Sequence, residues 1–298
     1  MRDPVSIFFI AEGDHLTAQA LLLAASLRFH NGTEPRLIAY VPKGVDPVPD
    51  PARAAFDALA VDLRPLPIEN GFWKSRYPHG NKLFACAAPR DPGLQIFMDS
   101  DMVCVAPLPF GDLAPLGRIA VVPEGTPTWG KTGDRWARLY AHFDLPLPED
   151  RVHLVRRRRI EFLPYFNAGF VAFRTGTGKE ERRFPDLWLE TAQEIDWNAP
   201  VGSKRPWLDQ ISLPVTLKRF GLEYQSLPDV WNFSISDRAF EPDARPRVIH
   251  YHSFRFASVW PQVRAEIARM SHRLGPALMA DLTPLYGGHW YRLPEPAA

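Results

Sequence analysis

The 298-residue chain has only two cysteines, Cys86 and Cys104, too few for a disulfide framework and not spaced like metal ligands. This scarcity favours a reduced, cytoplasmic setting. The longest largely apolar stretch, Ala20–Leu27, falls far short of the about 20 residues that a membrane-spanning helix needs. Positive and negative charges nearly balance, since the chain has 35 Lys and Arg residues and 34 Asp and Glu residues. The sequence therefore predicts neither a disulfide scaffold, nor a membrane span, nor a chain drawn as a whole to nucleic acid.

The composition is that of a folded globular protein. Hydrophobic residues make up 46% of the chain and charged residues 23%, which excludes wholesale disorder. The 31 prolines are scattered along the chain, which indicates rigid loops around a packed core and no long linker. Because no repeat and no linker divides the sequence, we expect one domain over residues 1–260, followed by a C-terminal helix and tail over residues 261–298.

Apolar runs alternate with segments of helical periodicity. Val5–Ala11 is a continuous apolar run of the kind found in strands buried on both faces. The strands we expect are Val5–Ala11, Arg36–Val41, Val61–Leu66, Leu94–Met98, Gly117–Val122, Ala168–Arg174 and Val248–Tyr251. The helices we expect are His15–Phe29, Pro51–Ala60, Asn81–Ala88, Asp134–Phe143, Lys179–Ile195, Trp207–Phe220 and Val259–Arg273. This alternation predicts an α/β fold with a mostly parallel central sheet and helices on both faces.

Two carboxylates follow the apolar strand Leu94–Met98. Asp99 and Asp101 stand two positions apart, so in an extended backbone both side chains point the same way while Ser100 faces away. Ligands bind at the carboxyl ends of strands in doubly wound sheets. Paired carboxylates there suit Mg²⁺ or Mn²⁺, which leaves positions open for diphosphate oxygens. The alternative is a turn with two solvated acids.

The same motif has a second chemical interpretation, phosphoryl transfer or hydrolysis. Haloacid-dehalogenase phosphatases present an aspartyl nucleophile and its acid partner at the end of a strand. That class places the motif close to the N-terminus and has further acidic motifs downstream. Here 98 residues precede Asp99, and Gly111-Asp112 lacks a second Asp nearby. This interpretation therefore ranks second.

An ordered set of motifs favours another class. Asn81-Lys82 is followed by Asp99-Ser100-Asp101, Phe166-Asn167-Ala168-Gly169, Asp209-Gln210 and Ile249-His250. In this order they resemble glycosyltransferase family 8, the retaining nucleotide-sugar transferases of the GT-A fold, over about residues 5–255. The resemblance implies a single GT-A-type, Rossmann-like domain. We expect residues 261–298, which lie beyond the resemblance, to pack on this domain or at the acceptor side. It also implies an enzyme that moves a hexose from a nucleotide-diphosphate sugar to an acceptor hydroxyl with retention of configuration.

The resemblance implies a role for each matching residue. Asp99 and Asp101 would bind a divalent ion, usually Mn²⁺ and otherwise Mg²⁺, with His250 as the third protein ligand. Because His252 lies two residues further on, it is an alternative ligand, although the family register favours His250. Ser100, within the acidic motif, and Lys82 would contact the donor.

The remaining motifs would handle the transferred sugar. The resemblance places Asn167 beside this sugar, and Asp209 with Gln210 at the sugar hydroxyls near the anomeric carbon. Asp209 is one candidate nucleophile for retention, and Gln210 would otherwise supply polar stabilisation. In a second route the acceptor attacks from the face that the diphosphate leaves, and the departing phosphate takes the proton, so that no separate base is needed.

The sequence departs from the family pattern at two donor contacts. Members carry an Asp and a Tyr that hold uracil after the Ala that ends the first strand; here Ala11 is followed by Gly13 and Leu16 at those positions. Asp14 or Glu12 would substitute for the Asp. A UDP-linked sugar is therefore expected from the family more than from the residues. After His250, the family's Gly and Lys-Pro-Trp are missing, and Arg255 would replace the lysine at the phosphates.

Arg156–Arg159 forms the strongest basic run in the sequence. It is either a solvated loop or a basic lip that contacts an anionic acceptor or a membrane surface. The run lacks interleaved aromatic residues, so we expect no nucleic-acid partner. We expect a cytoplasmic protein of bacterial type, in contact with the inner face of a membrane if the lip has this role, and active in saccharide biosynthesis. A non-catalytic nucleotide- or glycan-binding module on a transferase scaffold stays open as the non-enzymatic alternative.

Overall fold

The computed structural model of the chain describes residues 3–156, 160–176, 182–257 and 259–291. It has the expected α/β class, with a large, mostly parallel sheet and covering helices. The chain divides into two compact units, each assembled from separate stretches of sequence. The terminal unit comprises Arg2–Leu66, Met98–Phe110 and Asp229–Ala298, and the middle unit comprises Pro67–Phe97 and Gly111–Pro228.

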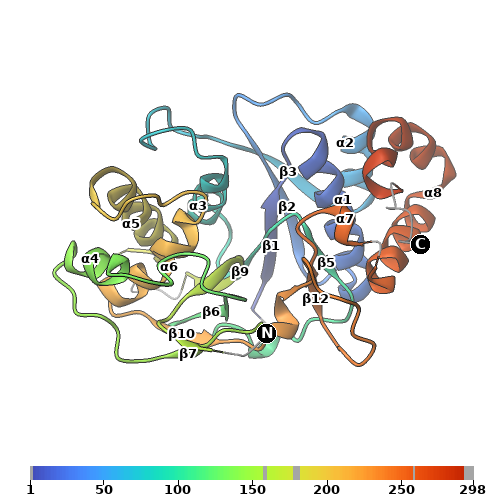
Figure 1. Cartoon of the computed structure of the whole chain (residues 1–298). Coiled ribbons are helices and arrows are strands. Elements are labelled where there is room, and N and C mark those ends of the chain that lie inside the picture. Colours follow the sequence, from blue (N-terminus) through green and yellow to red (C-terminus); the bar gives the residue numbers. More distant parts are fainter. Residues whose placement is uncertain (1–2, 157–159, 177–181, 258, 292–298) are drawn as a thin grey trace. The chain divides into compact units, whose positions relative to one another are not determined.

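The terminal unit is built around three parallel strands in the order β1-β2-β3 (Figure 1). All six residues of β1 are buried, as its continuous apolar sequence predicts. A second, three-stranded sheet has the order β11-β12-β5. The strands of this unit are β1 (Val5–Ile10), β2 (Arg36–Pro42), β3 (Val61–Leu66), β5 (Met102–Cys104), β11 (Phe233–Ser234) and β12 (Val248–His250). Its helices are α1 (Gly13–Asn31), α2 (Asp50–Ala58), α7 (Phe254–Ala257) and α8 (Pro261–Trp290).

The C-terminal helix α8 packs against α1 and α2, and Figure 1 shows the three helices together. The indole Nε1 of Trp290 donates a hydrogen bond to the carbonyl of Ala18, which fixes the end of α8 on α1. The helix is interrupted at Gly275, whose φ of 80° lies outside the helical region, directly before Pro276. The expected helix Val259–Arg273 covers only the part before this break. None of the described helices combines the length and the apolarity that crossing a membrane requires.

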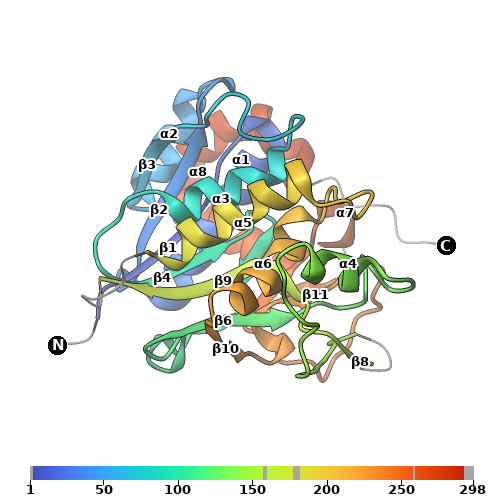
Figure 2. The same ribbon diagram turned by 90° about the vertical axis from the view of Figure 1, so that its left-hand side faces the viewer.

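In the middle unit the strand order is β10-β6-β9-β4. Figure 2 shows α3 and α5 side by side, and the contacts of the chain add α6, which packs on both α5 and β9. The strands are β4 (Gly93–Met98), β6 (Arg118–Pro123), β7 (Val152–His153), β8 (Glu161–Phe162), β9 (Phe166–Thr175) and β10 (Glu223–Ser226). The helices are α3 (Asn81–Ala87), α4 (Arg135–Ala141), α5 (Phe184–Asn198) and α6 (Leu208–Arg219). The described residues of the two units also form the short 3-10 helices η1 (Pro78–Gly80), η2 (Phe110–Asp112) and η3 (Asp229–Trp231).

Two expectations on secondary structure are wrong in detail. The strand expected to alternate over Ala168–Arg174 is longer and almost continuously buried, because β9 lies between two neighbouring strands under α6. The helix expected from Lys179 begins at Phe184 with a proline in its first turn, and residues 179–181 lie outside the described residues. The short strands β5, β7, β8, β10 and β11 were not anticipated, because two to four residues carry too little periodicity.

Candidate functional site

The acidic motif lies in a turn, not in extended backbone. The backbone N–H of Met102 donates to the carbonyl of Asp99 at 3.1 Å, which closes the turn between β4 and β5. The extended-strand argument for the alignment of the two carboxylates is therefore wrong, and the turn itself brings Asp99 and Asp101 together. The hydroxyl of Ser100 is buried and donates to the carbonyl of Ile10.

Asp99, Asp101 and His250 form a metal-type cluster in the terminal unit. One ligand atom from each residue lies within 4.8 Å of the others. His250 ends β12, which pairs antiparallel with β5 in a register that sets His250 opposite Met102. Pairing of two short strands thus brings together residues that are about 150 positions apart in sequence.

Asn232 orients the imidazole of His250. The Nδ1 of His250 lies 2.9 Å from Oδ1 of Asn232, an acceptor, so Nδ1 carries the proton. The other ring nitrogen, Nε2, lies 3.0 Å from Oδ1 of Asp101 and so faces a carboxylate of the cluster. Two carboxylates and one oriented imidazole are a donor set that fits Mn²⁺, so the residues present fit the expected ion.

His252, the alternative ligand, is arranged differently. It follows the end of β12 with a φ of 56°, so the chain leaves the extended conformation before it. Its ring stacks on that of His250 at a centroid distance of 3.8 Å, and its Nδ1 lies 2.7 Å from the hydroxyl of Ser236. The three-residue cluster contains His250 and not His252.

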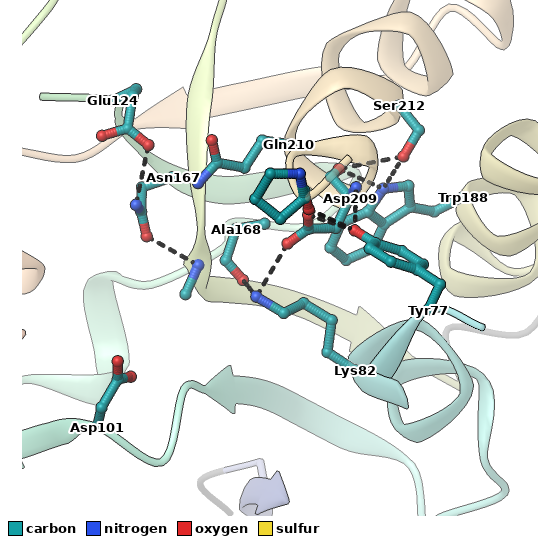
Figure 3. Close-up of polar contacts among 12 residues, drawn as sticks. Tyr77, Lys82, Asp101, Glu124, Asn167, Ala168, Trp188, Asp209, Gln210 and Ser212 are labelled. Carbon is teal, nitrogen blue, oxygen red and sulfur yellow. Dashed lines mark hydrogen bonds and ion pairs between the residues drawn. The ribbon is translucent and has the colours of Figure 1, made fainter. Parts of the chain in front are cut away.

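A second cluster, in the middle unit, joins Lys82, Asp209 and Tyr77 (Figure 3). The Nζ of Lys82 lies 2.9 Å from Oδ2 of Asp209, and both side chains are less than a tenth exposed. The hydroxyl of Tyr77 donates to Oδ1 of Asp209 at 2.8 Å. Burial raises the pKa of Tyr77, and the charge of Asp209 raises it further, so this phenol stays protonated as a donor. Both carboxylate oxygens of Asp209 therefore have a partner within the protein.

The local structure of α6 fixes Asp209. The residue lies in the first turn of the helix, where the helix dipole favours a negative charge. Its carbonyl accepts hydrogen bonds from the indole Nε1 of Trp188 and the hydroxyl of Ser212. The backbone N–H of Asp209 donates to the Tyr77 hydroxyl at 3.1 Å. The main chain and the carboxylate are thus held by the same small set of buried groups.

Asn167 and Gln210 contact Glu124 and Tyr165, which lie outside the motifs quoted from the sequence. The Nδ2 of Asn167 donates to Oε2 of Glu124 at 2.9 Å, and its Oδ1 accepts from the backbone N–H of Gly169. The Oε1 of Gln210 accepts from the hydroxyl of Tyr165 at 3.0 Å. Glu124 directly follows the buried strand β6, as Asp99 follows β4, but it lacks a second carboxylate two positions away and so does not match the pattern that selected Asp99.

The other residues that the sequence predicts to contact the sugar donor lie in the following places. The backbone N–H of Ala11 donates to the carbonyl of Tyr40, and Asp14 lies exposed in the first turn of α1. Arg255 lies in α7, with its guanidinium 4.5 Å from the ring centroid of Phe256. Within the basic run, Arg156 donates its backbone N–H to Gly125, while residues 157–159 lie outside the described residues.

Comparison with known sequences gives the family. The profile described as "Rhodobacterales glycosyltransferase domain" matches residues 7–221, which is most of the chain. The chain belongs to this glycosyltransferase family. It is accordingly an enzyme that transfers a glycosyl group, and the match decides against phosphoryl transfer at the Asp-x-Asp motif. Among curated proteins, no sequence matches the chain.

Solved structures agree on the fold of this glycosyltransferase. The galactosyltransferase LgtC, in complex with donor and acceptor sugar analogues, is similar with a TM-score of 0.60 at 14% identity, over 93% of this chain and 99% of LgtC. Mouse xyloside xylosyltransferase 1 is similar with a TM-score of 0.52 at 13% identity, over 83% of this chain and 97% of that one. The bifunctional glycosyltransferase WbbM is similar with a TM-score of 0.58 at 15% identity, over 94% of this chain and 51% of WbbM. The expected GT-A-type fold and the expected glycosyltransferase activity are thus confirmed.

Proposed function

We propose that this glycosyltransferase uses a divalent cation to bind a nucleotide-diphosphate sugar and moves its hexose to an acceptor hydroxyl with retention. The observation that carries the proposal is the convergence of Asp99, Asp101 and His250 in a member of a glycosyltransferase family. LgtC, with the same fold, binds donor and acceptor sugar analogues, which supports the assignment of both substrates.

The metal-type cluster would hold Mn²⁺ or Mg²⁺ and the diphosphate. A cation there would offset the negative charge that develops on the departing diphosphate. Asp99 and Asp101 supply the anionic oxygens, and Asn232 keeps the lone pair of His250 Nε2 directed at the cluster. The preference of imidazole for borderline ions favours Mn²⁺ over Mg²⁺.

Lys82, Asp209 and the residues around them would act on the transferred sugar. Asp209 is buried and gives one oxygen to Lys82 and the other to Tyr77, which argues against its attacking the anomeric carbon. We assign Asp209 to holding Lys82 and contacting sugar hydroxyls. Retention then follows the second route, in which the acceptor attacks on the face that the diphosphate leaves and a phosphate oxygen takes its proton.

Besides the metal-type cluster, we assign five residues to binding the nucleotide-sugar donor: Ala11, Asp14, Lys82, Ser100 and Arg255. The buried hydroxyl of Ser100 is bonded to Ile10, so a contact of Ser100 with the donor would use its backbone. UDP is the nucleotide that the family resemblance favours. We assign residues 1–260 to the transferase domain, with the C-terminal segment 261–298 packed on it through α8.

Calorimetric titration of the nucleotides tests the proposal. UDP, GDP, ADP, CDP and dTDP are titrated separately into the protein with Mn²⁺ and again with a chelator. We expect one nucleotide, UDP, to bind in a metal-dependent manner. Absence of metal-dependent binding for all five would overturn the donor site. The anomeric configuration of the transfer product, measured by NMR, then tests retention.

Two histidine variants provide the matched comparison. His250→Ala removes the proposed ligand, and His252→Ala removes the stacked neighbour that lies outside the cluster. We expect a loss of Mn²⁺-dependent nucleotide affinity of about 10- to 100-fold for the first variant and little change for the second. The reverse order would assign the metal to His252.

A further inference from the structure

A relay of hydroxyl groups leads to the carboxamide of Gln210 in the middle unit. The hydroxyls of Thr128 and Tyr165 lie 2.6 Å apart, and the Tyr165 hydroxyl donates to Oε1 of Gln210 at 3.0 Å. A tyrosine hydroxyl has a single proton to donate. Because Tyr165 gives its proton to Gln210, Thr128 is the donor in the other contact. The relay therefore runs in one direction, from Thr128 through Tyr165 to Gln210.

The phenol at the centre of this relay is rigid and protonated. Tyr165 is fully buried, and its ring packs edge-on against Trp136 at a centroid distance of 5.6 Å. Its carbonyl accepts the backbone N–H of Glu124, so its main chain is fixed as well. Burial raises the pKa of Tyr165, and the charges of Glu124 and Asp209 add to the effect. The phenol is a permanent hydrogen-bond donor at physiological pH.

The relay determines which end of the Gln210 amide is presented to a ligand. Oε1 is taken by Tyr165, and Nε2 has no hydrogen-bond partner among the described residues. Gln210 is only half-buried. Its Nε2 is not one of the buried side-chain atoms that lack a hydrogen-bond partner among the described residues. Gln210 is the last group of the relay. Its amide N–H groups are therefore available to donate hydrogen bonds to a substrate.

We propose that Tyr165 is a positioning residue for Gln210, which fixes the carboxamide so that Nε2 donates to the transferred sugar. This inference rests on the proposed function and specifies the chemistry of Gln210 in it. The substrate group opposite Nε2 is a hydrogen-bond acceptor, a hydroxyl or the ring oxygen of the hexose. Gln210 acts as a donor of hydrogen bonds and does not supply an oxygen to the anomeric carbon.

Single and double variants separate positioning from a structural role. Turnover and KM are measured for hydrolysis of a panel of UDP-hexoses with Mn²⁺. We expect Tyr165→Phe, which keeps the ring and removes the hydroxyl, to lower kcat about 10-fold with KM for the donor unchanged. Gln210→Ala should lower kcat about 10- to 100-fold. The double variant should be no slower than Gln210→Ala, because Tyr165 acts through that side chain.

Tyr140→Phe is the matched control. Tyr140 is buried and packs near Trp136 as Tyr165 does, but its hydroxyl has no hydrogen-bond partner within the described part of the chain. We expect Tyr140→Phe to leave kcat unchanged. An equal loss in Tyr140→Phe and Tyr165→Phe would show that the effect comes from packing and would overturn the proposal.

Gln210→Glu tests the direction of the amide. A carboxylate still accepts from Tyr165, but it places an oxygen where Nε2 lies. We expect a loss of kcat at least as large as that of Gln210→Ala. Retained turnover in Gln210→Glu, or additive losses in the double variant, would overturn the inference while leaving the proposed function intact. Lack of turnover of every UDP-hexose by the wild-type protein would instead overturn the UDP-sugar assignment, and this inference with it.

Discussion

The Nζ of Lys82 and the Oδ2 of Asp209 form an ion pair at 2.9 Å in which both side chains are buried. Lys82 lies at the start of α3 and Asp209 in the first turn of α6, 127 positions later in the sequence. The backbone carbonyl of Ala168 lies 3.5 Å from the same Nζ. A buried pair of this kind is maintained because either charge alone would be costly to bury.

Removal of one partner of this pair should destabilise the protein. Lys82→Met leaves the Asp209 carboxylate buried with Tyr77 as its remaining side-chain donor, and we expect a loss of about 3–5 kcal/mol in the free energy of unfolding. The double variant Lys82→Met/Asp209→Asn removes both charges and should lose less than the sum of the single variants. Urea unfolding measures the free energy of unfolding of the three variants. Additive losses would contradict a stabilising interaction between Lys82 and Asp209.

Asn232 should affect metal affinity through His250. Asn232→Ala removes the acceptor that fixes Nδ1 of His250, so the imidazole can rotate and change tautomer. We expect Mn²⁺ affinity to fall about 10-fold, measured by calorimetry in the presence of the bound nucleotide. Asn198→Ala, at a surface asparagine bonded to Glu194, is the control and should leave the affinity unchanged. Equal affinities in wild type and Asn232→Ala would mean that other contacts fix His250.

Glu124 should support turnover through Asn167. Glu124→Ala removes the acceptor of the Asn167 Nδ2 proton, and we expect kcat to fall about 10-fold while nucleotide affinity stays the same. Glu124→Gln keeps an acceptor oxygen for Asn167 and should lose less. If Glu124→Gln is as slow as Glu124→Ala, the charge of Glu124 matters more than its hydrogen bond to Asn167.

His15 should make stability depend on pH. The His15 side chain is exposed, but partial desolvation lowers its pKa from the usual 6.5, and the nearby His289 lowers this pKa further, against the opposing charge of Asp101. As pH falls below 6.5, the unfolded chain therefore takes up this proton before the folded chain does, and the free energy of unfolding decreases. We expect His15→Gln to reduce the drop in Tm between pH 7 and pH 5.5, measured with chelator throughout. His153→Gln, at another exposed histidine, is the control; an equal change in both variants would contradict the assignment to His15.

Much of the fold could be predicted because local patterns agreed with it. The continuous apolar run at Val5–Ala11 predicted a fully buried strand, and β1 is one. The helical period over His15–Phe29 predicted α1, which spans Gly13–Asn31. By contrast, the strands of two to four residues depend on partners distant in sequence, such as β5 on β12, and leave no period of their own.

The sequence by itself determined the α/β class, the ordered motifs of a glycosyltransferase and the candidate residues Asp99, Asp101, Lys82, Asp209 and His250. These follow from residue type, spacing and order along the chain, which are local properties. Only the tertiary structure decided how the residues are held. It showed that a turn aligns the two aspartates, and that Asn232, Tyr77 and Tyr165 fix His250, Asp209 and Gln210. Such hydrogen-bond partners are set by side-chain packing between distant segments, and packing of this kind leaves no periodicity in the sequence.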